Sequence, residues 1–358
     1  MSKAHCFSLF LLLCLPAFAS AQQPASPAGA PAHTEPASSP APRNGEGRIQ
    51  LDVVVTDKPG KPVSGLELKD FTLLDDGQPR KILSFHAAGG EVQGAPPVEV
   101  ILLIDTINLT FEQVAEVRQA MARFLLRNGG YLAQPASLIV VSDQGVSFQP
   151  EPSLDGNAMA AAVNQLNSGL RTHDSTSESD EVDRHVLSIN MLTTIVKREA
   201  AKPGRKLLIW AGRGWPTLDS SQMDLSRKEQ QREFQSIVDL STWLREARIA
   251  LYSISAGAPG TSGFFYEGYL KGVKSAGKAG PPNLGLEVLA IQSGGRVLGP
   301  DNDLEAQIED CVQDAGAFYT LSFDPPNADK PNEYHDLTVQ SGRPGLKART
   351  STGYYNQP

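Results

Sequence analysis

The chain has 358 residues, of which 40% are hydrophobic, 7% aromatic and 20% charged. This length and apolar content fit about two ordinary domains, and they exclude a chain that is disordered, collagen-like or coiled-coil over most of its length. With 32 basic and 40 acidic residues the net charge is −8, so the chain lacks the positive field that collects nucleic acid. We therefore expect no nucleic-acid partner.

The N-terminus predicts a targeting segment. Lys3 precedes an apolar run over residues 7–15, and small residues dominate positions 17–21. A positive start, a short apolar stretch and an Ala-x-Ala ending are typical of a cleaved secretory signal. We expect residues 1–21 to be a signal peptide and the mature protein to be secreted or periplasmic. No later segment has the ~18 uninterrupted apolar residues of a membrane span.

Residues 22–47 predict a disordered linker. They are rich in Pro, Ala, Ser and Gly and have almost no large apolar side chain. Such a stretch cannot bury enough surface to offset the entropy lost on ordering, so it stays extended. Its role is spacing.

Both ends of the remaining chain predict β-strands. Apolar and polar residues alternate over 49–55, and an extended piece at 71–74 meets an Asp-Asp-Gly turn. Further strands are predicted near the C-terminus, at 318–323, 335–340 and 346–355. So few strands form a marginal core alone. We therefore predict that segments 48–96 and 317–358 pack together as one small β-sandwich, into which the middle of the chain is inserted.

The middle of the chain, 97–316, alternates short apolar runs with amphipathic helices. Residues 100–104 are almost continuously aliphatic, as expected of a strand buried on both faces of a parallel sheet. Thr110 caps the next helix, whose apolar stripe includes Phe111, and Val186 belongs to a similar stripe in a later helix. Further strands are predicted at 137–142, 206–211, 249–254 and 296–298, and helices at 155–167, 181–200, 224–247, 284–292 and 302–315. Alternating units of this kind favour an open, doubly wound α/β sheet.

Residue types that carry covalent catalysis are poorly placed. Of the three cysteines, two leave with the signal, and Cys311 lies in an apolar helical pattern typical of a small buried residue. The chain has no Gly-x-Ser-x-Gly elbow, and its histidines, including His173 beside Asp174, lack a readable triad context. We expect that the protein is not an enzyme. The alternative function, from a different functional class, is that of a hydrolase.

An apolar strand that ends in Asp105 is flanked by characteristic stretches at 51–57, 62–66, 70–77, 318–323 and 343–349. This arrangement resembles a von Willebrand factor A domain, and the flanks are similar to the secreted bacterial family called VWFA-related, prominent in acidobacteria. The resemblance covers about residues 48–356. It implies a fold of class α/β, in which a Rossmann-like von Willebrand factor A domain, with a central, mostly parallel sheet and helices on both faces, is inserted in the small β-sandwich.

The resemblance also implies a metal-binding top face. A domains usually bind a protein ligand through Mg²⁺ held by Asp-x-Ser-x-Ser, together with a Thr and an Asp from two other loops. The motif here begins at Asp105, and the aliphatic residues Ile107 and Leu109 stand at its serine positions. A glycine followed by Arg213 stands at the second Asp position, and Thr172 is the counterpart of the Thr. We expect a degenerate metal-ion-dependent adhesion site (MIDAS) and no cofactor. The alternative is weak Mg²⁺ or Ca²⁺ binding at Asp105, with Thr172 as the second ligand.

Loops at the same edge of the sheet offer contacts for a protein partner. Arg213 can grip a carboxylate without a metal. An insertion at 255–283 leaves the carboxyl edge of the sheet, where open α/β folds bind ligands, and it carries clustered aromatic residues. These aromatic side chains either contact the partner or pack on the protein's own surface. The candidate contact residues are Arg213, Trp215, Phe264, Phe265 and Tyr266. We predict a secreted, non-enzymatic protein-interaction module of the bacterial envelope.

Overall fold

The computed structural model describes residues 47–88, 98–166, 177–216, 218, 225–255, 266–299 and 303–358. The predicted signal peptide, nearly all of the predicted linker, and the candidate site residues Thr172, Phe264 and Phe265 lie outside these ranges. Asn44–Pro358 forms one compact unit. Within the described ranges, no helix combines the length and the apolar character that a membrane crossing requires.

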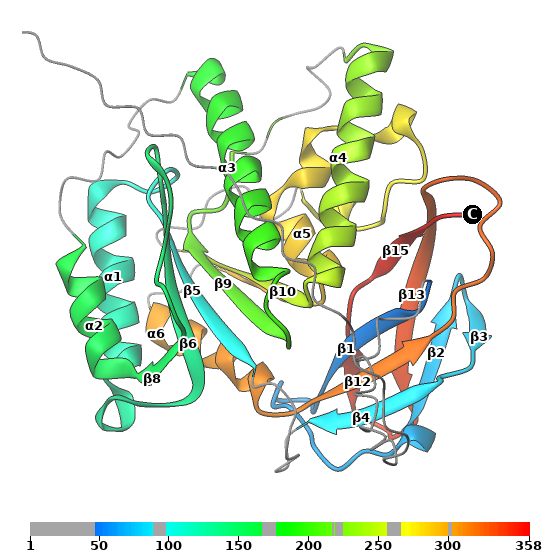
Figure 1. Cartoon of the computed structure of the whole chain (residues 1–358), viewed down its shortest axis with the longest axis horizontal. Coiled ribbons are helices and arrows are strands. Elements are labelled where there is room, and N and C mark those ends of the chain that lie inside the picture. Colours follow the sequence, from blue (N-terminus) through cyan, green and yellow to red (C-terminus); the bar gives the residue numbers. More distant parts are fainter. Residues whose placement is uncertain are drawn as a thin grey trace, which may run out of the picture. The chain divides into compact units, whose positions relative to one another are not determined.

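A central sheet of seven strands is mostly parallel (Figure 1). Its strands are β5 (Glu99–Asp105), β6 (Tyr131–Ser142), β7 (Gly145–Phe148), β8 (Ser153–Asp155), β9 (Lys206–Gly212), β10 (Ile249–Ser255) and β11 (Val297–Leu298). They lie in the order β11-β10-β9-β5-β6-β7, in which β7 is antiparallel to β6, and β8 also pairs with β6. This is the strand order of a doubly wound fold, and the order reverses between β5 and β9.

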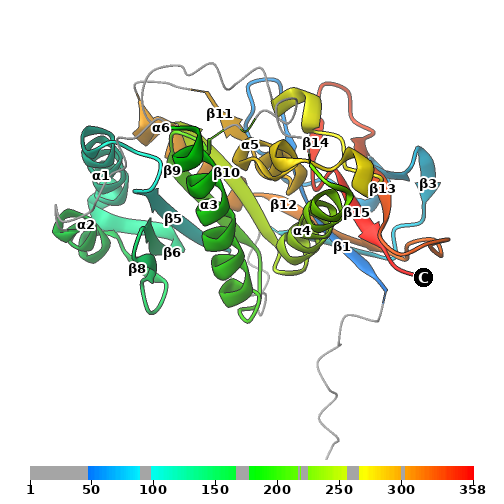
Figure 2. The same ribbon diagram turned by 90° about the horizontal axis from the view of Figure 1, so that it is seen from above.

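Helices cover both faces of this sheet (Figure 2). They are α1 (Phe111–Leu125), α2 (Gly156–Gln165), α3 (Glu178–Glu199), α4 (Arg227–Glu246), α5 (Leu286–Gln292) and α6 (Leu304–Val312). One apolar core joins Leu102 and Ile104 of β5 to α1, α2 and α6, and the other joins Ile101 and Leu103 to α3, α4 and α5. Because alternate residues of β5 enter opposite cores, the strand is aliphatic throughout.

Single-turn helices complete the connections. They are η1 (Leu68–Asp70), η2 (Arg127–Gly130), η4 (Tyr266–Tyr269), η5 (Ala276–Lys278), η6 (Pro281–Leu284) and η7 (Gln313–Ala315). Three of these, η4 to η6, lie in or just after the long insertion that follows β10.

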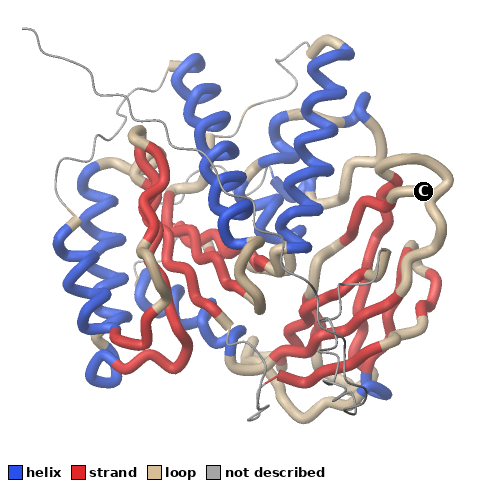
Figure 3. The backbone as a smooth tube through the Cα atoms, in the orientation of Figure 1, coloured by secondary structure: helices blue, strands red, loops and turns tan. Residues whose placement is uncertain are grey.

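Two antiparallel sheets combine strands from both ends of the chain, which the colours of Figure 1 distinguish, and Figure 3 draws all strands of the molecule in red. One has the order β14-β1-β12-β4 and the other β15-β13-β2-β3. Their strands are β1 (Ile49–Thr56), β2 (Phe71–Asp75), β3 (Gln78–Arg80), β4 (Ser84–Ala88), β12 (Phe318–Phe323), β13 (Glu333–Ser341), β14 (Lys347–Arg349) and β15 (Gly353–Asn356). Leu51 of β1 and Leu321 of β12 lie opposite each other in a core shared with β2 and β13. The predicted fold class is confirmed.

Buried polar contacts join the antiparallel sheets to the central sheet. Asp314, in η7, accepts hydrogen bonds from the Tyr252 hydroxyl of β10 at 2.8 Å and from the Arg349 guanidinium of β14. Arg248, just before β10, donates to Asp52 of β1 at 2.6 and 3.0 Å. These contacts are charged and partly or fully buried, so they form only when the antiparallel sheets and the central sheet are both folded.

Two apolar side chains that the sequence placed in buried stripes are exposed. Phe111 is 51% exposed and Val186 is 49% exposed. Phe111 is the first residue of α1, and a helical side chain leans toward the N-terminus, so its ring extends past the helix end rather than over the sheet. Helix α3 instead buries Leu192, Ile195 and Val196, about two to three turns nearer its C-terminus.

Candidate functional site

The first candidate site lies where the strand order of the central sheet reverses. Asp105 ends β5, and Gly212 ends the neighbouring strand β9. A Cβ added at Gly212 would lie only 3.2 Å from the Cβ of Asp105, so the two strand ends touch. Ligands of open α/β sheets bind in the crevice at this point, outside the carboxyl ends of the strands.

The carboxylate of Asp105 is fully buried and accepts four hydrogen bonds from the protein. Its Oδ1 accepts the backbone N–H groups of Ile107 at 2.9 Å and Asn108 at 3.1 Å. Its Oδ2 accepts the side-chain Nδ2 of Asn108 and the indole Nε1 of Trp210, each at 2.9 Å. Burial raises the pKa of Asp105, and these donors oppose the rise. The carboxylate is therefore the common acceptor of a buried hydrogen-bond network.

The neighbours of Asp105 supply few oxygen atoms. Ile107 packs into the core under α3 and α4, and Leu109 packs into the core under α1. The hydroxyl of Thr106 is used within the sheet, because its Oγ1 donates to the carbonyl of Val141 at 2.8 Å. Mg²⁺ keeps several waters but is anchored by one or two carboxylates, whereas the carboxylate of Asp105 already accepts four N–H groups. The described residues around Asp105 do not fit that mode of binding.

Two tryptophans and a histidine form the apolar side of this network. Trp215 is 5% exposed and lies edge-on to Trp210, with ring centroids 5.3 Å apart. It also lies edge-on to His185 of α3, at 6.3 Å. Trp215 therefore packs against the donor Trp210 within the core, and its side chain offers almost no accessible surface to a partner.

His185 makes stability depend on pH. Its side chain is buried, its ring nitrogens have no hydrogen-bond partner among the described residues, and burial lowers its pKa from 6.5 to about 4. The unfolded chain therefore binds a proton first, and stability present above pH 6.5 is lost as the pH falls toward 4. The loss attributable to His185 is about 3 kcal/mol. Urea unfolding at pH 7, 5.5 and 4 measures it.

The control for this prediction is a second histidine. His185→Phe keeps an aromatic ring against Trp215 and should remove its share of the loss, whereas His86→Phe, at an exposed position, should leave the pH dependence unchanged. If the wild type and His185→Phe lose stability in parallel between pH 6.5 and 4, the assignment to His185 is wrong.

Accessible groups surround the network at the same edge. Arg213, directly after Gly212, is exposed, and no ion pair or hydrogen bond to it is found among the described residues. Gly214 has φ +84, and a Cβ there would lie 2.5 Å from Oε1 of Glu287. The loop backbone therefore packs closely against the Glu287 carboxylate. Tyr266 is partly buried, and burial raises its pKa. The exposed Phe111 follows the same strand end, although its spacing in the apolar stripe of α1 predicts a buried side chain.

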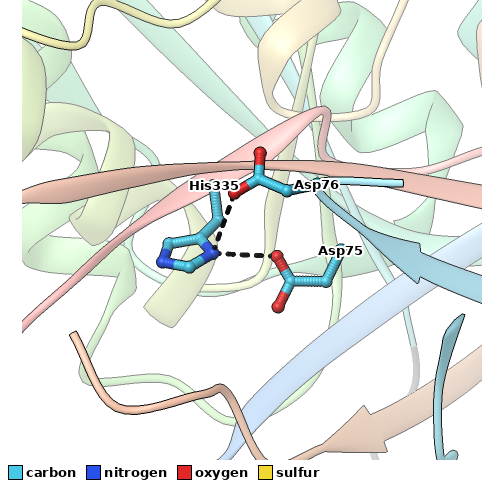
Figure 4. A group of neighbouring side chains, drawn as sticks. All are labelled: Asp75, Asp76 and His335. Atoms are coloured by element: carbon cyan, nitrogen blue, oxygen red, sulfur yellow. Dashed lines mark hydrogen bonds and ion pairs between the residues drawn. The ribbon is translucent and has the colours of Figure 1, made fainter. Parts of the chain in front are cut away.

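A second cluster lies in the antiparallel sheets (Figure 4). Nδ1 of His335 is 2.9 Å from Oδ1 of Asp75 and 3.3 Å from Oδ2 of Asp76. These three potential metal-ligating atoms all lie within 4.8 Å of one another. The sequence singled out the two aspartates only as part of a turn, because nothing in their spacing predicts contact with a residue near the C-terminus.

Comparisons with known proteins give the chain no family name. No protein-family model and no curated protein matches it. It is similar to a solved aerotolerance-related membrane protein from Bacteroides fragilis, at 10% identity and a TM-score of 0.35, over 61% of this chain and 98% of that one. Manganese-loaded TRAP protein from Plasmodium vivax is similar at 10% identity and a TM-score of 0.35, over 75% and 97%.

The human COPII-coat protein Sec24c is also similar, at 10% identity and a TM-score of 0.37, over 76% of this chain. The chain spans about half of that protein, 46% of its length. At such identities these likenesses concern the fold alone. The order of strands and the two helical layers are those of a doubly wound α/β sheet, to which the chain adds two antiparallel sheets.

Proposed function

We propose that this chain is a secreted protein-interaction module of the VWFA-related type, which holds a protein partner at the carboxyl edge of its central sheet without a metal ion. The observation that carries the proposal is the carboxylate of Asp105, whose two oxygens each accept two N–H groups. A carboxylate so occupied has no free lone pair directed toward solvent. At the carboxyl edge of the central sheet, a partner would therefore be bound by protein side chains rather than by a metal ion.

Two exposed side chains supply the contacts. Arg213 offers a planar guanidinium that matches a partner carboxylate in a bidentate pair. Phe111 offers an apolar ring of the kind that anchors interfaces. They follow adjacent parallel strands, so they lie at the same edge of the sheet. Tyr266, which is partly buried, is the described member of the aromatic group that the sequence predicts for this surface, and Phe264 and Phe265 lie outside the described residues. Secretion rests on the pattern of the first 21 residues.

The hydrolase alternative finds no support in the described residues. A catalytic imidazole needs one nitrogen oriented by an acid and the other directed at a nucleophile. His185 has neither partner, and the Nε2 atom of His335 is buried without a hydrogen-bond partner in the described part of the chain.

Photocrosslinking from position 111 tests the proposal. Replacing Phe111 with p-benzoylphenylalanine in the full chain should give light-dependent protein adducts in the envelope of the native cells. EDTA should not reduce them, because the contact needs no metal. Adding Arg213→Glu should lower their yield about tenfold, as expected when a charged interface pair is broken. Adducts are measured by immunoblot and identified by mass spectrometry.

The matched control lies on the same helix. Leu126, the C-cap of α1, is 50% exposed and stands about 22 Å away along the helix axis, at the opposite edge of the sheet. The same photoreactive residue at position 126 should give no such adduct. Equal adducts from both positions, or adducts that disappear with EDTA and return with Mg²⁺ or Ca²⁺, would contradict a metal-free contact at this edge.

A further inference from the structure

We propose that Asp75, Asp76 and His335 form a binding site for a divalent cation of the zinc class. The three residues come from opposite ends of the chain. Asp75 ends β2, Asp76 opens the turn to β3 with φ 48°, and His335 lies on β13, the strand that pairs with β2. The pairing of β2 with β13 therefore assembles the cluster, and only the folded protein contains it.

The two carboxylates are held so that each turns one oxygen inward. Oδ2 of Asp75 accepts hydrogen bonds from Nε of Arg80 at 3.2 Å and from the Tyr354 hydroxyl at 3.0 Å. Oδ1 of Asp76 accepts the backbone N–H of Asp336 at 3.1 Å. The remaining oxygens, Oδ1 of Asp75 and Oδ2 of Asp76, face His335 (Figure 4). Outer partners of this kind orient the ligands of metal sites.

The imidazole is equally constrained. His335 is 7% exposed, and its ring stacks on Tyr354 with centroids 5.0 Å apart and planes 15° from parallel. Nδ1 is thereby directed at both carboxylates. Nε2 is buried and has no partner among the described residues, so the ring lacks the outer acceptor that metal-bound histidines usually have.

The charge of the cluster favours a cation. Asp75 is fully buried, and within the described ranges its ion pairs are with Arg80 and with His335 itself. When the imidazole is neutral, two carboxylates face one guanidinium, which leaves one negative charge in excess. A divalent ion between the inward atoms compensates that charge more fully than a shared proton does.

The donor set selects the ion. One imidazole nitrogen and two carboxylate oxygens suit Zn²⁺, whereas Mg²⁺ and Ca²⁺ prefer oxygen ligands alone. Three protein ligands leave one position of a tetrahedral ion open. The side chain of Asp76 is 43% exposed, so that position faces solvent and takes a water molecule. Because the imidazole lacks an outer acceptor, we expect a Kd on the order of micromolar, about 10- to 100-fold weaker than a fully supported site.

Calorimetric titration of the full chain with Zn²⁺ tests this site. One ion should bind per chain, and the melting temperature should rise with Zn²⁺ concentration, because the ion binds only where β2 and β13 are paired. Asp76→Asn removes one ligand at a partly exposed position and should weaken binding at least tenfold, while the metal-free melting temperature stays close to that of the wild type.

Asp336→Asn is the matched control. Asp336 is next to His335 in sequence and its side chain is 52% exposed, but its carboxylate lies outside the cluster. It should bind Zn²⁺ as the wild type does. The proposal is overturned if no saturable binding occurs below millimolar Zn²⁺ or if the two variants bind alike. Binding lost in Asp105→Asn but kept in Asp76→Asn would also overturn it, and would place the ion at the edge of the central sheet instead.

Discussion

Replacing Asp105 with alanine should lower the free energy of unfolding by about 4 kcal/mol. The carboxylate accepts four N–H groups in a fully buried position, so its removal leaves the donors of Ile107, Asn108 and Trp210 unpaired. Each unpaired buried donor costs about 1–3 kcal/mol, less what local rearrangement recovers. Urea unfolding in EDTA measures the loss without any metal contribution.

Trp210→Phe provides an intermediate case for the loss of hydrogen bonds to Asp105. The variant keeps an aromatic ring against Trp215 and removes only one of the four donors, so it should cost about 1 kcal/mol for the hydrogen bond in addition to the packing lost with the smaller ring. A carboxylate kept for metal binding behaves in the opposite way. Without its ion it is an uncompensated buried charge, and alanine relieves it. Unchanged or increased stability of Asp105→Ala in EDTA would therefore refute the structural role assigned here.

Replacing Asp314 with alanine should cost about 3–5 kcal/mol, as expected when one partner of a buried ion pair is removed. Asp314 is almost fully buried, accepts the Tyr252 hydroxyl at 2.8 Å and pairs with Arg349. Its loss leaves the Arg349 guanidinium without its counter-charge and the hydroxyl without an acceptor. Because these groups belong to β14 and β10, the variant should loosen the antiparallel sheets from the central sheet.

An exposed ion pair provides the comparison. Asp324 pairs with Arg48 at 3.0 Å, and both side chains are about half exposed or more. Asp324→Ala should therefore change stability by less than about 1 kcal/mol. Hydrogen exchange on both variants locates the effect: amides of β14 and β12 should exchange faster only in Asp314→Ala. Equal stability losses in the two variants would show that burial of the Asp314 network contributes nothing.

The fold follows from signals that are local in the sequence. The aliphatic run of β5 predicted a strand buried on both faces, because both helical layers demand apolar side chains from it. Thr110 predicted the start of α1, and the structure has the capping box with Gln113. No sequence motif predicted the pairing of the N- and C-terminal strands. It was predicted because neither end alone had enough strands to form a stable core.

The candidate site was harder to predict because its contacts are distant in sequence. Trp210 and Trp215 are equally aromatic, but Trp210 lies on β9 and donates to Asp105 of the neighbouring strand, whereas Trp215 lies in the loop after β9 and packs against Trp210. Phe111 fits an apolar stripe by its spacing, but its place at the first position of α1 exposes it. No spacing rule connects His335 with Asp75, because a sheet register brings them together.

The interleaving of β1 and β2 with β12 and β13 has a consequence for biosynthesis. Ribosomes release β1 and β2 early, and the strands that pair with them emerge only after the whole central sheet has been translated. At bacterial and eukaryotic elongation speeds this interval lasts roughly tens of seconds. Throughout it, the unpaired edges of β1 and β2 are open to pairing with other unfolded chains. A holding chaperone, or delayed collapse of the first fifty residues of the folded unit, would protect the chain until its last strands arrive.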